Sequence, residues 1–369
     1  MDKVRLLAFY LPQFHSIPEN DLWWGKDFTE WTNTKTSRPL FNGHYQPHIP
    51  ADLGYYDLRD HSILEKQAEM AQEYGVHGFV YYHYWFSGRR LLDLPVKNML
   101  TVKTPDMPFC LCWSNENWTR RWDGLDQEIL IAQEYSIDDD VSHIRNLIPA
   151  FEDKRYFRIK GRPVFIVYRA EQLPNAKKTT EIWRSEVVKA GLGDPYLIQV
   201  ESFTSYQDPA DNGFDAAIEF APDWRRIGIP LYRDPEKEIL NRNDDLKAAC
   251  LKNMVYLYDD VIRNMLAKPE PNYTRFSGVF PGWDNSPRRQ KTAMATIIHG
   301  SAPDKYENYL KKVISRAYTH LNGEERLVFI NAWNEWGEGC HLEPDRRFGH
   351  AYLKATRNVL DDTESINIP

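Results

Sequence analysis

The stretch from Arg326 to Asp345 reads RLVFINAWNEWGEGCHLEPD, and it changes character partway along. Residues 327–330 are apolar and rich in β-branched and aromatic side chains, which is typical of a buried strand. Gly337 and Gly339 allow tight backbone turns shortly afterwards. A core strand that ends in indoles and carboxylates predicts the floor of an active site better than a solvated strand end. The polar and indole residues that follow the apolar run are Asn331, Trp333, Asn334, Glu335, Trp336 and Glu338.

Glu335 and Glu338 are three residues apart, so on a continuing strand their side chains would point to opposite faces. The glycines predict that the strand stops at about Glu335 and that the chain turns, which lets both carboxyls reach one pocket. Two carboxyls in an aromatic pocket suit glycoside cleavage, because one can protonate the leaving oxygen while the other acts as base or nucleophile. Indole rings offer flat apolar faces to sugar rings and an N–H to their hydroxyls.

Residues 335–344, EWGEGCHLEP, resemble the E-W-x-E-G-x-x-[IL]-E-P signature of glycoside hydrolase family 99. Two further segments, LAFYLPQFH at 7–15 and WSNENW at 113–118, look more like the WbsX-like proteins of bacterial polysaccharide gene clusters, which are often labelled glycosyltransferases. The likeness extends roughly from residue 4 to residue 352. Together the motifs are specific for the superfamily and not for a substrate.

The resemblance to family 99 implies a retaining mechanism in which the substrate's own 2-hydroxyl attacks C1 and forms a 1,2-anhydro sugar. By motif position, Glu335 is the expected base and Glu338 the expected acid/base. Gly337 stands where the hydrolases commonly have His, so the support of the acid is expected to differ. The chemistry needs a 2-hydroxyl trans to the leaving group. This requirement favours α-mannosides and α-rhamnosides as substrates.

Eight strand-like runs alternate with amphipathic patterns along the 369 residues. Continuous apolar strands separated by helices indicate a parallel sheet, and eight such units predict a single (β/α)8 TIM barrel over residues 1–369. An open doubly wound sheet is the alternative, but no Gly-rich first turn supports it. The predicted strands are 5–11, 78–85, 108–113, 163–168, 196–201, 216–220, 277–280 and 327–332. The predicted helices are 61–74, 138–151, 179–190, 244–266, 305–321 and 350–360.

A barrel of this kind places its functional residues at the C-terminal ends of the strands. Polar and aromatic residues recur at that end of seven of the predicted strands. A single strand-end acid is usually solvated, but this repeated placement favours a functional site. The residues expected to bind substrate are Tyr10, His83, Trp85, Trp113, Asn115, Glu116, Asn117, Glu201, Glu219, Trp283, Asp284, Asn334 and Trp336.

Two long loop insertions, at about 13–60 and 222–275, are expected to wall the cleft, since loops of this length are usually functional. The first carries Trp23, Trp24 and Trp31. The second carries Trp224 followed by Arg225 and Arg226, which either meet an anionic group on a glycan or are solvated arginines on a packing insertion.

No metal ion or other cofactor is expected. The histidines have no convincing metal-binding spacing, and His44 and His48 lie in a Pro-containing loop. Cys110 and Cys112 share a face of an apolar strand and are expected to be core thiols, so nothing demands an oxidising compartment.

The composition of the chain limits which kinds of binding partner are expected. The chain has 12 Trp, 21 Tyr and 17 Phe, which fits a sugar-binding cleft, so the expected partner is an oligo- or polysaccharide. A net charge of −7 argues against nucleic acid, and no apolar run has membrane-spanning length, so no membrane insertion is expected. The apolar run at the N-terminus is too short for a signal peptide. The expected compartment is the cytoplasm, or the periplasm or cell surface if a leader has been removed.

Two other functions stay open beside the hydrolase. A glycosyltransferase would need a nucleotide-sugar site, and no DxD-type motif lies beside a strand, since residues 138–140 are better placed to begin a helix. A non-catalytic glycan-binding protein is the third reading. The presence of both Glu335 and Glu338 argues against it.

Overall fold

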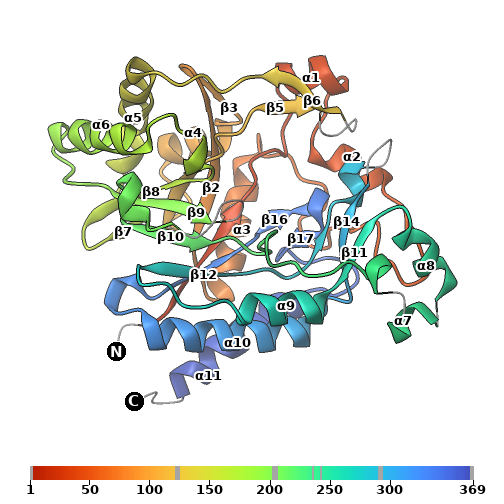
Figure 1. The fold of residues 1–369 in the computed structure, drawn as a ribbon. Helices are drawn as coiled ribbons and strands as arrows, with labels where there is room; N and C mark the ends of the chain where they lie inside the picture. The colour runs from red at the N-terminus through yellow and green to blue at the C-terminus, as the bar shows by residue number, and fades with distance from the viewer. Residues whose placement is uncertain are drawn as a thin grey trace.

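The computed structural model describes residues 3–120, 125–201, 207–234, 237–241, 243–289 and 294–365. Within these ranges, eight parallel strands form a closed barrel (Figure 1). The first strand, β1, pairs in parallel with β2 on one side and with β15 on the other, which closes the ring. The predicted (β/α)8 fold is therefore confirmed. The barrel strands are β1 (Arg5–Tyr10), β2 (Val76–Phe86), β4 (Phe109–Trp113), β8 (Arg162–Val167), β9 (Tyr196–Glu201), β10 (Ala216–Glu219), β12 (Arg275–Val279) and β15 (Leu327–Ile330).

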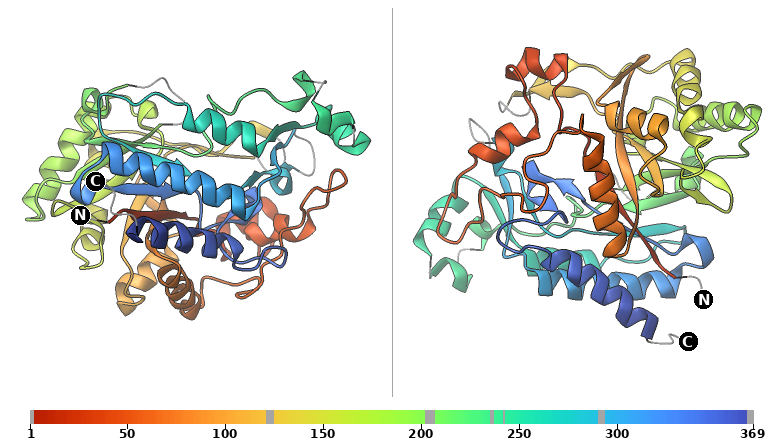
Figure 2. Two further views of the ribbon diagram at one scale, coloured as in Figure 1. Left: turned by 90° about the horizontal axis from the view of Figure 1, so that it is seen from below. Right: turned by 180° about the vertical axis from the view of Figure 1, so that it is seen from behind.

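Five long helices cover the outside of the barrel, close to where the sequence predicts them. Some of them begin at capping side chains: the Asp60 side chain accepts the backbone N–H of Ser62, and Ser136 accepts that of Asp139. Figures 1 and 2 show α10 and α11 side by side along one flank, and α5 and α6 together on another. The helices are α3 (His61–Glu73), α5 (Ile137–Phe151), α6 (Ala176–Lys189), α10 (Pro303–His320) and α11 (Ala351–Ser365).

Side chains alternate between the barrel interior and the helix layer, as they must along a strand. The Phe9 ring lies inside, with its centroid 6.0 Å from that of Phe329 and 5.5 Å from that of Tyr82. The next residue, Tyr10, points outward, and its hydroxyl donates to Gln67 of α3 at 2.7 Å. This alternation decides which residues near a strand end face the barrel mouth.

The single helix predicted over 244–266 is wrong. The structure has α8 (Asp244–Cys250), then β11 (Met254–Leu257), then α9 (Tyr258–Leu266). The strand pairs in parallel with β14 (Thr296–His299), which in turn pairs with β13 (Trp283–Asp284). A four-residue apolar run is too short for periodicity to separate strand from helix, so partners distant in sequence decide the outcome.

The other elements are short, and most of them lie in the connections at the mouth. They are α1 (Pro18–Trp24), α2 (Glu30–Thr36), β3 (Arg89–Leu91), α4 (Leu94–Val102), β5 (Trp118–Arg120), β6 (Leu125–Ile131), β7 (Arg158–Ile159), α7 (Glu238–Asn241), β16 (Asn334–Glu335) and β17 (Cys340–His341). Among the described helices, none combines the length and apolar character needed to cross a membrane.

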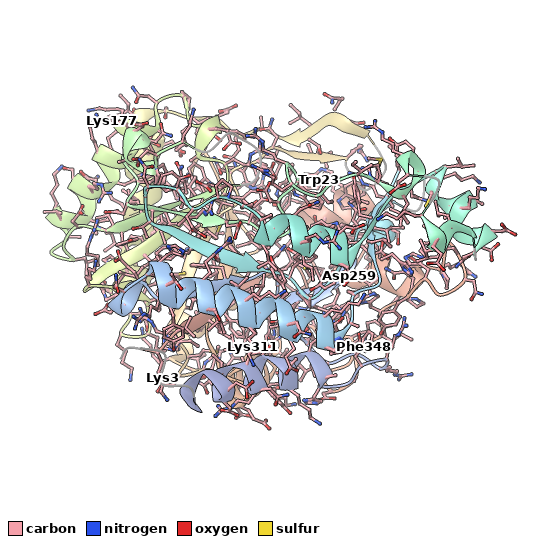
Figure 3. All side chains as sticks on the ribbon, turned by 60° about the horizontal axis from the view of Figure 1, so that its bottom comes forward. Lys3, Trp23, Lys177, Asp259, Lys311 and Phe348 are labelled. Atoms are coloured by element: carbon pink, nitrogen blue, oxygen red, sulfur yellow. The ribbon has the colours of Figure 1, made fainter. Side chains whose placement is uncertain are left out.

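The two ends of the barrel are well separated. Figure 3 labels Lys3, just before β1, far from Trp23 of α1. Figures 1 and 2 show the start of β1 and the end of α11 near each other, away from α1 and α2. The long first connection therefore lies at the end of the barrel opposite to these two points.

Candidate active site

A cavity of about 360 Å³ lies at the C-terminal mouth of the barrel. Its lining includes residues on or just after β1, β2, β4, β8, β10 and the segment after β15, which is where a barrel of this class places its site. Aromatic side chains from both long loops contribute to the wall. The aromatic lining residues are Trp23, Trp24, Tyr82, Tyr84, Trp118, Tyr168, Phe220, Trp224 and Trp283.

The chain turns after β15 in a way that brings Glu335 and Glu338 into this one cavity. A small antiparallel hairpin, β16–β17, pairs Glu335 with Cys340. A single turn of 3-10 helix over residues 336–338 connects its strands, and Gly339 ends that turn with φ of 55°. A residue with a side chain rarely adopts this left-handed conformation, which accounts for glycine there.

Arg288 joins the two carboxylates. One guanidinium nitrogen donates to Glu335 at 2.9 Å, and another forms an ion pair with Glu338. The third, Nε, donates to Glu30 of α2 at 2.7 Å. The Arg288 guanidinium thus contacts three carboxylates, and all four side chains are largely buried. Burial and the repulsion between neighbouring carboxylates favour a proton on one of them.

Burial is the main reason that the pKa of Glu335 is raised, to about 8; the charge of Arg288 opposes this effect, and the carboxylates of Glu338 and Glu30 add to it. A carboxylate with a raised pKa is a stronger base once it has lost its proton. Glu335 therefore suits abstraction of a proton from a sugar hydroxyl at slightly basic pH, where it is largely ionised.

Glu30 occupies the space that a side chain at position 337 would need. A Cβ built on Gly337 would lie 1.5 Å from Oε1 of Glu30 and 3.1 Å from Nε of Arg288. In this chain, α2 supplies a carboxylate where a side chain at 337 would otherwise lie.

Glu343, also in the motif, anchors the far side of the hairpin and does not line the cavity. Four side chains donate to its carboxylate: Trp333 at 3.0 Å, Trp336 at 2.6 Å, Tyr56 at 2.9 Å and Gln67 at 2.6 Å. Burial raises its pKa, to about 7, against the lowering effect of these donors. The motif glutamate thus fixes the hairpin to the first loop and to α3.

Of the residues predicted to bind substrate, three line the cavity beside the glutamate pair: Glu116, Asn117 and Trp283. Glu116 forms an ion pair with Arg169, another lining residue. Asn117 accepts the backbone N–H of Gln133 at 2.7 Å. These three remain candidates for contact with a sugar.

Several of the others point outward from the barrel and do not line the cavity. His83 contacts His143 of α5 at 2.9 Å, and the Trp85 indole donates to Asp139. Tyr10 and Trp113 are likewise fully buried. Tyr82 and Tyr84 line the cavity instead, because alternation along β2 turns His83 and Trp85 to the other face.

The remaining predicted residues have structural partners. Asn334 clamps the backbone of Leu11, accepting its N–H at 2.7 Å and donating to its carbonyl at 3.1 Å. Asn115 does the same with the backbone of Arg169. Among the predicted residues not lining the cavity, Glu201 binds Tyr273, Glu219 pairs with buried Lys268, Asp284 binds His44 and Gln46, and Trp336 binds Glu343.

The prediction that the two long loop insertions wall the cleft holds for some of their residues. Trp23, Trp24 and Trp224 line the cavity, whereas Trp31 packs behind it, with its ring centroid 5.5 Å from that of Trp336. Arg225 and Arg226 are exposed and lie outside the lining, so the packing-insertion reading fits their positions.

Arg288 is the chief residue that sequence reasoning missed. It follows β13 and has no motif of its own. Only the folded chain brings it between Glu30 and the β16–β17 hairpin, which are far apart in sequence.

A closed (β/α)8 barrel with two carboxylates in an aromatic cavity at its C-terminal mouth has the layout of a barrel enzyme that acts on sugars. A family model described as Glycosyltransferase WbsX matches residues 6–356, and the chain therefore belongs to the WbsX family. This membership confirms the resemblance to WbsX-like proteins seen in the motifs.

Two curated relatives, each named Uncharacterized protein WxcX, come from strains of Xanthomonas campestris pv. campestris. Each is 42% identical over 355 residues, which cover 96% of this chain and 49% of the relative. The chain thus spans about half the length of these relatives.

Solved structures share the fold at low identity. A GH99 endo-alpha-mannosidase from Bacteroides thetaiotaomicron gives a TM-score of 0.59 at 16% identity, with 99% of both chains covered. The same enzyme in complex with BIS-TRIS-Propane gives 0.57 at 14%, also with 99% of both chains covered. A glycoside hydrolase-like protein gives 0.58 at 15%, covering 98% of this chain and 94% of that one. At these identities the likeness concerns the barrel alone.

Proposed function

We propose that this chain is a retaining glycoside hydrolase that cleaves α-mannoside-like linkages in a bacterial polysaccharide, a mannan or a rhamnan, with participation of the substrate's 2-hydroxyl. One observation carries the proposal: Glu335 and Glu338 share the guanidinium of Arg288 inside an aromatic cavity. Such a pair can hold one proton between two carboxyls, which is what acid–base cleavage of a glycoside requires.

In the first step, the Glu335 carboxylate takes the proton from the sugar 2-hydroxyl while O2 attacks C1. Glu338 donates its proton to the departing glycosidic oxygen, and a 1,2-anhydro sugar forms. In the second step, Glu338 takes a proton from water, whose oxygen adds to C1. Glu335 then returns its proton to O2. Two inversions at C1 leave the anomeric configuration retained.

The walls of the cavity support a sugar as the ligand. Tyr82 and Tyr84 are buried beside Glu335, and Trp118 packs its ring against Tyr84 with centroids 5.3 Å apart. Aromatic faces bind the C–H faces of sugar rings, while indole and phenol groups reach hydroxyls. Attack of O2 on C1 requires a 2-hydroxyl trans to the leaving group, which α-mannosides and α-rhamnosides present.

The family description favours a second candidate, transfer of a sugar to an acceptor. The same pair supports it if an acceptor hydroxyl replaces water in the second step, and that route needs no nucleotide sugar. A transferase of the ordinary kind would depend on one.

The test is incubation with a panel of α-mannans, rhamnans and O-antigen polysaccharides, with and without nucleotide sugars, followed by product analysis. We expect new reducing ends without any nucleotide sugar, and their loss in Glu335→Gln and Glu338→Gln. Glu69→Gln, on the exposed face of α3, is the control that should behave as wild type. Products that form only with nucleotide sugars would replace hydrolysis by transfer, and binding without any product would leave a lectin-like role.

A further inference from the structure

A second, smaller cavity of about 90 Å³ lies behind the β16–β17 hairpin. Among the described residues, His48, His341 and Asp345 form a group whose ligand atoms all lie within 4.8 Å of one another. All three line this smaller cavity, and none lines the larger one. We infer that His48, His341 and Asp345 bind one divalent transition-metal ion, with zinc as the ion that fits them best.

The orientation of His341 supports the site. Its Nδ1 lies 2.9 Å from the carbonyl oxygen of Glu343, so the ring donates its proton there. This contact leaves Nε2 without a proton, so that its lone pair is available. Nε2 lies 2.8 Å from Nδ1 of His48 and 4.0 Å from Oδ2 of Asp345. A carbonyl on the second ring nitrogen is the usual support of a metal-bound histidine, because it fixes both tautomer and ring orientation.

Without an ion, His48 donates from Nδ1 to His341. With an ion, His48 takes its other tautomer, and the two nitrogens separate by about 0.5 Å to reach the spacing of tetrahedral ligands at about 2.0–2.1 Å from zinc.

The ligand set selects the class of ion. Two imidazole nitrogens and one carboxylate suit zinc and its neighbours in the first transition row, whereas calcium and magnesium prefer oxygen ligands. The adjoining cavity leaves room for water as a fourth ligand.

A second pair of close histidines in the chain shows that a histidine contact does not by itself make a metal site. His83 and His143 also approach within 2.9 Å, but their surroundings are the rings of Trp85 and Trp113, and no described carboxylate completes a group of three. The carboxylate of Asp345 and the adjoining cavity distinguish the proposed site.

The ion would join two parts of the mouth. The backbone of 49–51 already pairs with 344–346, through Arg346 N–H to Ile49 O and Ala51 N–H to Pro344 O, each at 2.9 Å. The His341 ring stacks on Trp336, with centroids 3.7 Å apart. A bound ion would therefore lock the first loop to the hairpin that carries Glu335, as a positioning element rather than a participant in the reaction.

The test begins with chain stripped of metal by a chelator and then freed of the chelator. Zinc chloride is titrated by calorimetry, retained zinc is counted by elemental analysis after gel filtration, and thermal unfolding is followed with and without zinc. We expect one zinc per chain and a higher Tm with zinc. His48→Gln and Asp345→Asn should each weaken binding by more than about 100-fold, since loss of a ligand exceeds the 10–100-fold effect of outer-shell changes.

His350→Gln is the matched control, because His350 pairs with Asp52 at 2.5 Å at the surface and lies outside the site. It should bind zinc as wild type does. Asp345→Asn keeps an oxygen for the backbone N–H groups of Arg347 and Phe348, so it should remain folded. Equal zinc binding by wild type and both ligand variants would overturn the proposal, as would an anomalous zinc peak in crystals only at other positions.

Discussion

At Arg288, one positive charge meets the carboxylates of Glu30, Glu335 and Glu338. The guanidinium is planar and carries five N–H donors, so it can hold three partners in fixed directions, which a lysine cannot. The arrangement keeps the two candidate catalytic groups close, and the repulsion between their carboxylates favours one proton on the pair. Glu335 and Glu338 are chemically identical, so their opposite roles as base and acid follow from their positions in the site.

Glu338→Gln should abolish turnover of glycosides with poor leaving groups and spare turnover of an activated aryl glycoside. The reason is that proton donation matters most when the leaving oxygen is basic. The measurement is kcat/KM of the variant on both substrate types, relative to wild type. Equal losses on the two substrates would show that Glu338 is not the proton donor.

The pH dependence of kcat/KM tests the role of Glu335. Because burial raises its pKa to about 8, a base at this position is mostly protonated at neutral pH, and activity should rise as the pH approaches 8. Glu335→Gln should remove this rising limb and lower the rate by a factor of about 10² to 10⁴. A wild-type rate that instead falls as pH rises through 8 would make Glu335 the proton donor.

The β16–β17 hairpin depends on α2, because Glu30 fills the space beside Gly337. Gly337→Ala should displace Glu30 and disturb Arg288, whereas the same change in a Glu30→Ala background should cost much less. Residues in contact typically couple by about 0.5–3 kcal/mol in such a cycle. Denaturant unfolding of the two single variants and the double variant measures it. Additive losses would mean that the carboxylate of Glu30 moves aside freely.

The other support of the hairpin is Glu343. In Glu343→Gln, an amide N–H₂ would face Trp and Gln donors, so at least one buried donor loses its acceptor. We expect the free energy of unfolding to fall by about 1–3 kcal/mol, the penalty for a buried unsatisfied group. Urea titration beside the exposed control Glu69→Gln gives the difference. A loss no larger than that of the control would show that the network contributes little.

At the level of elements, the sequence could predict strands but not always the face of each side chain. The eight strand runs are long enough and apolar enough to be recognised, and all eight are present. Within β2, the residues expected to bind substrate included His83 and Trp85 but not Tyr82 and Tyr84, which alternation places in the cavity. A register argument from Phe9 and its neighbours would have selected the tyrosines.

At the level of the whole molecule, contacts distant in sequence set the limit of prediction. The motif brings Glu335, Glu338 and Glu343 to notice because they are neighbours in the chain. Arg288 and Glu30, which are 258 residues apart in the chain, join them only through folding. The histidine cluster is similar: local spacing around His48 gave no metal expectation, because its partner His341 is 293 residues away.

The central claim is that Glu335 acts on O2 of the sugar and not on C1. Its most direct test is the intact mass of the whole chain after incubation with a substrate whose 2-hydroxyl is replaced by fluorine and whose leaving group is good. We predict binding, confirmed by calorimetry, with no turnover and no added mass, because the attacking oxygen is missing. A covalent adduct on Glu335 would contradict the claim and make this residue a direct nucleophile.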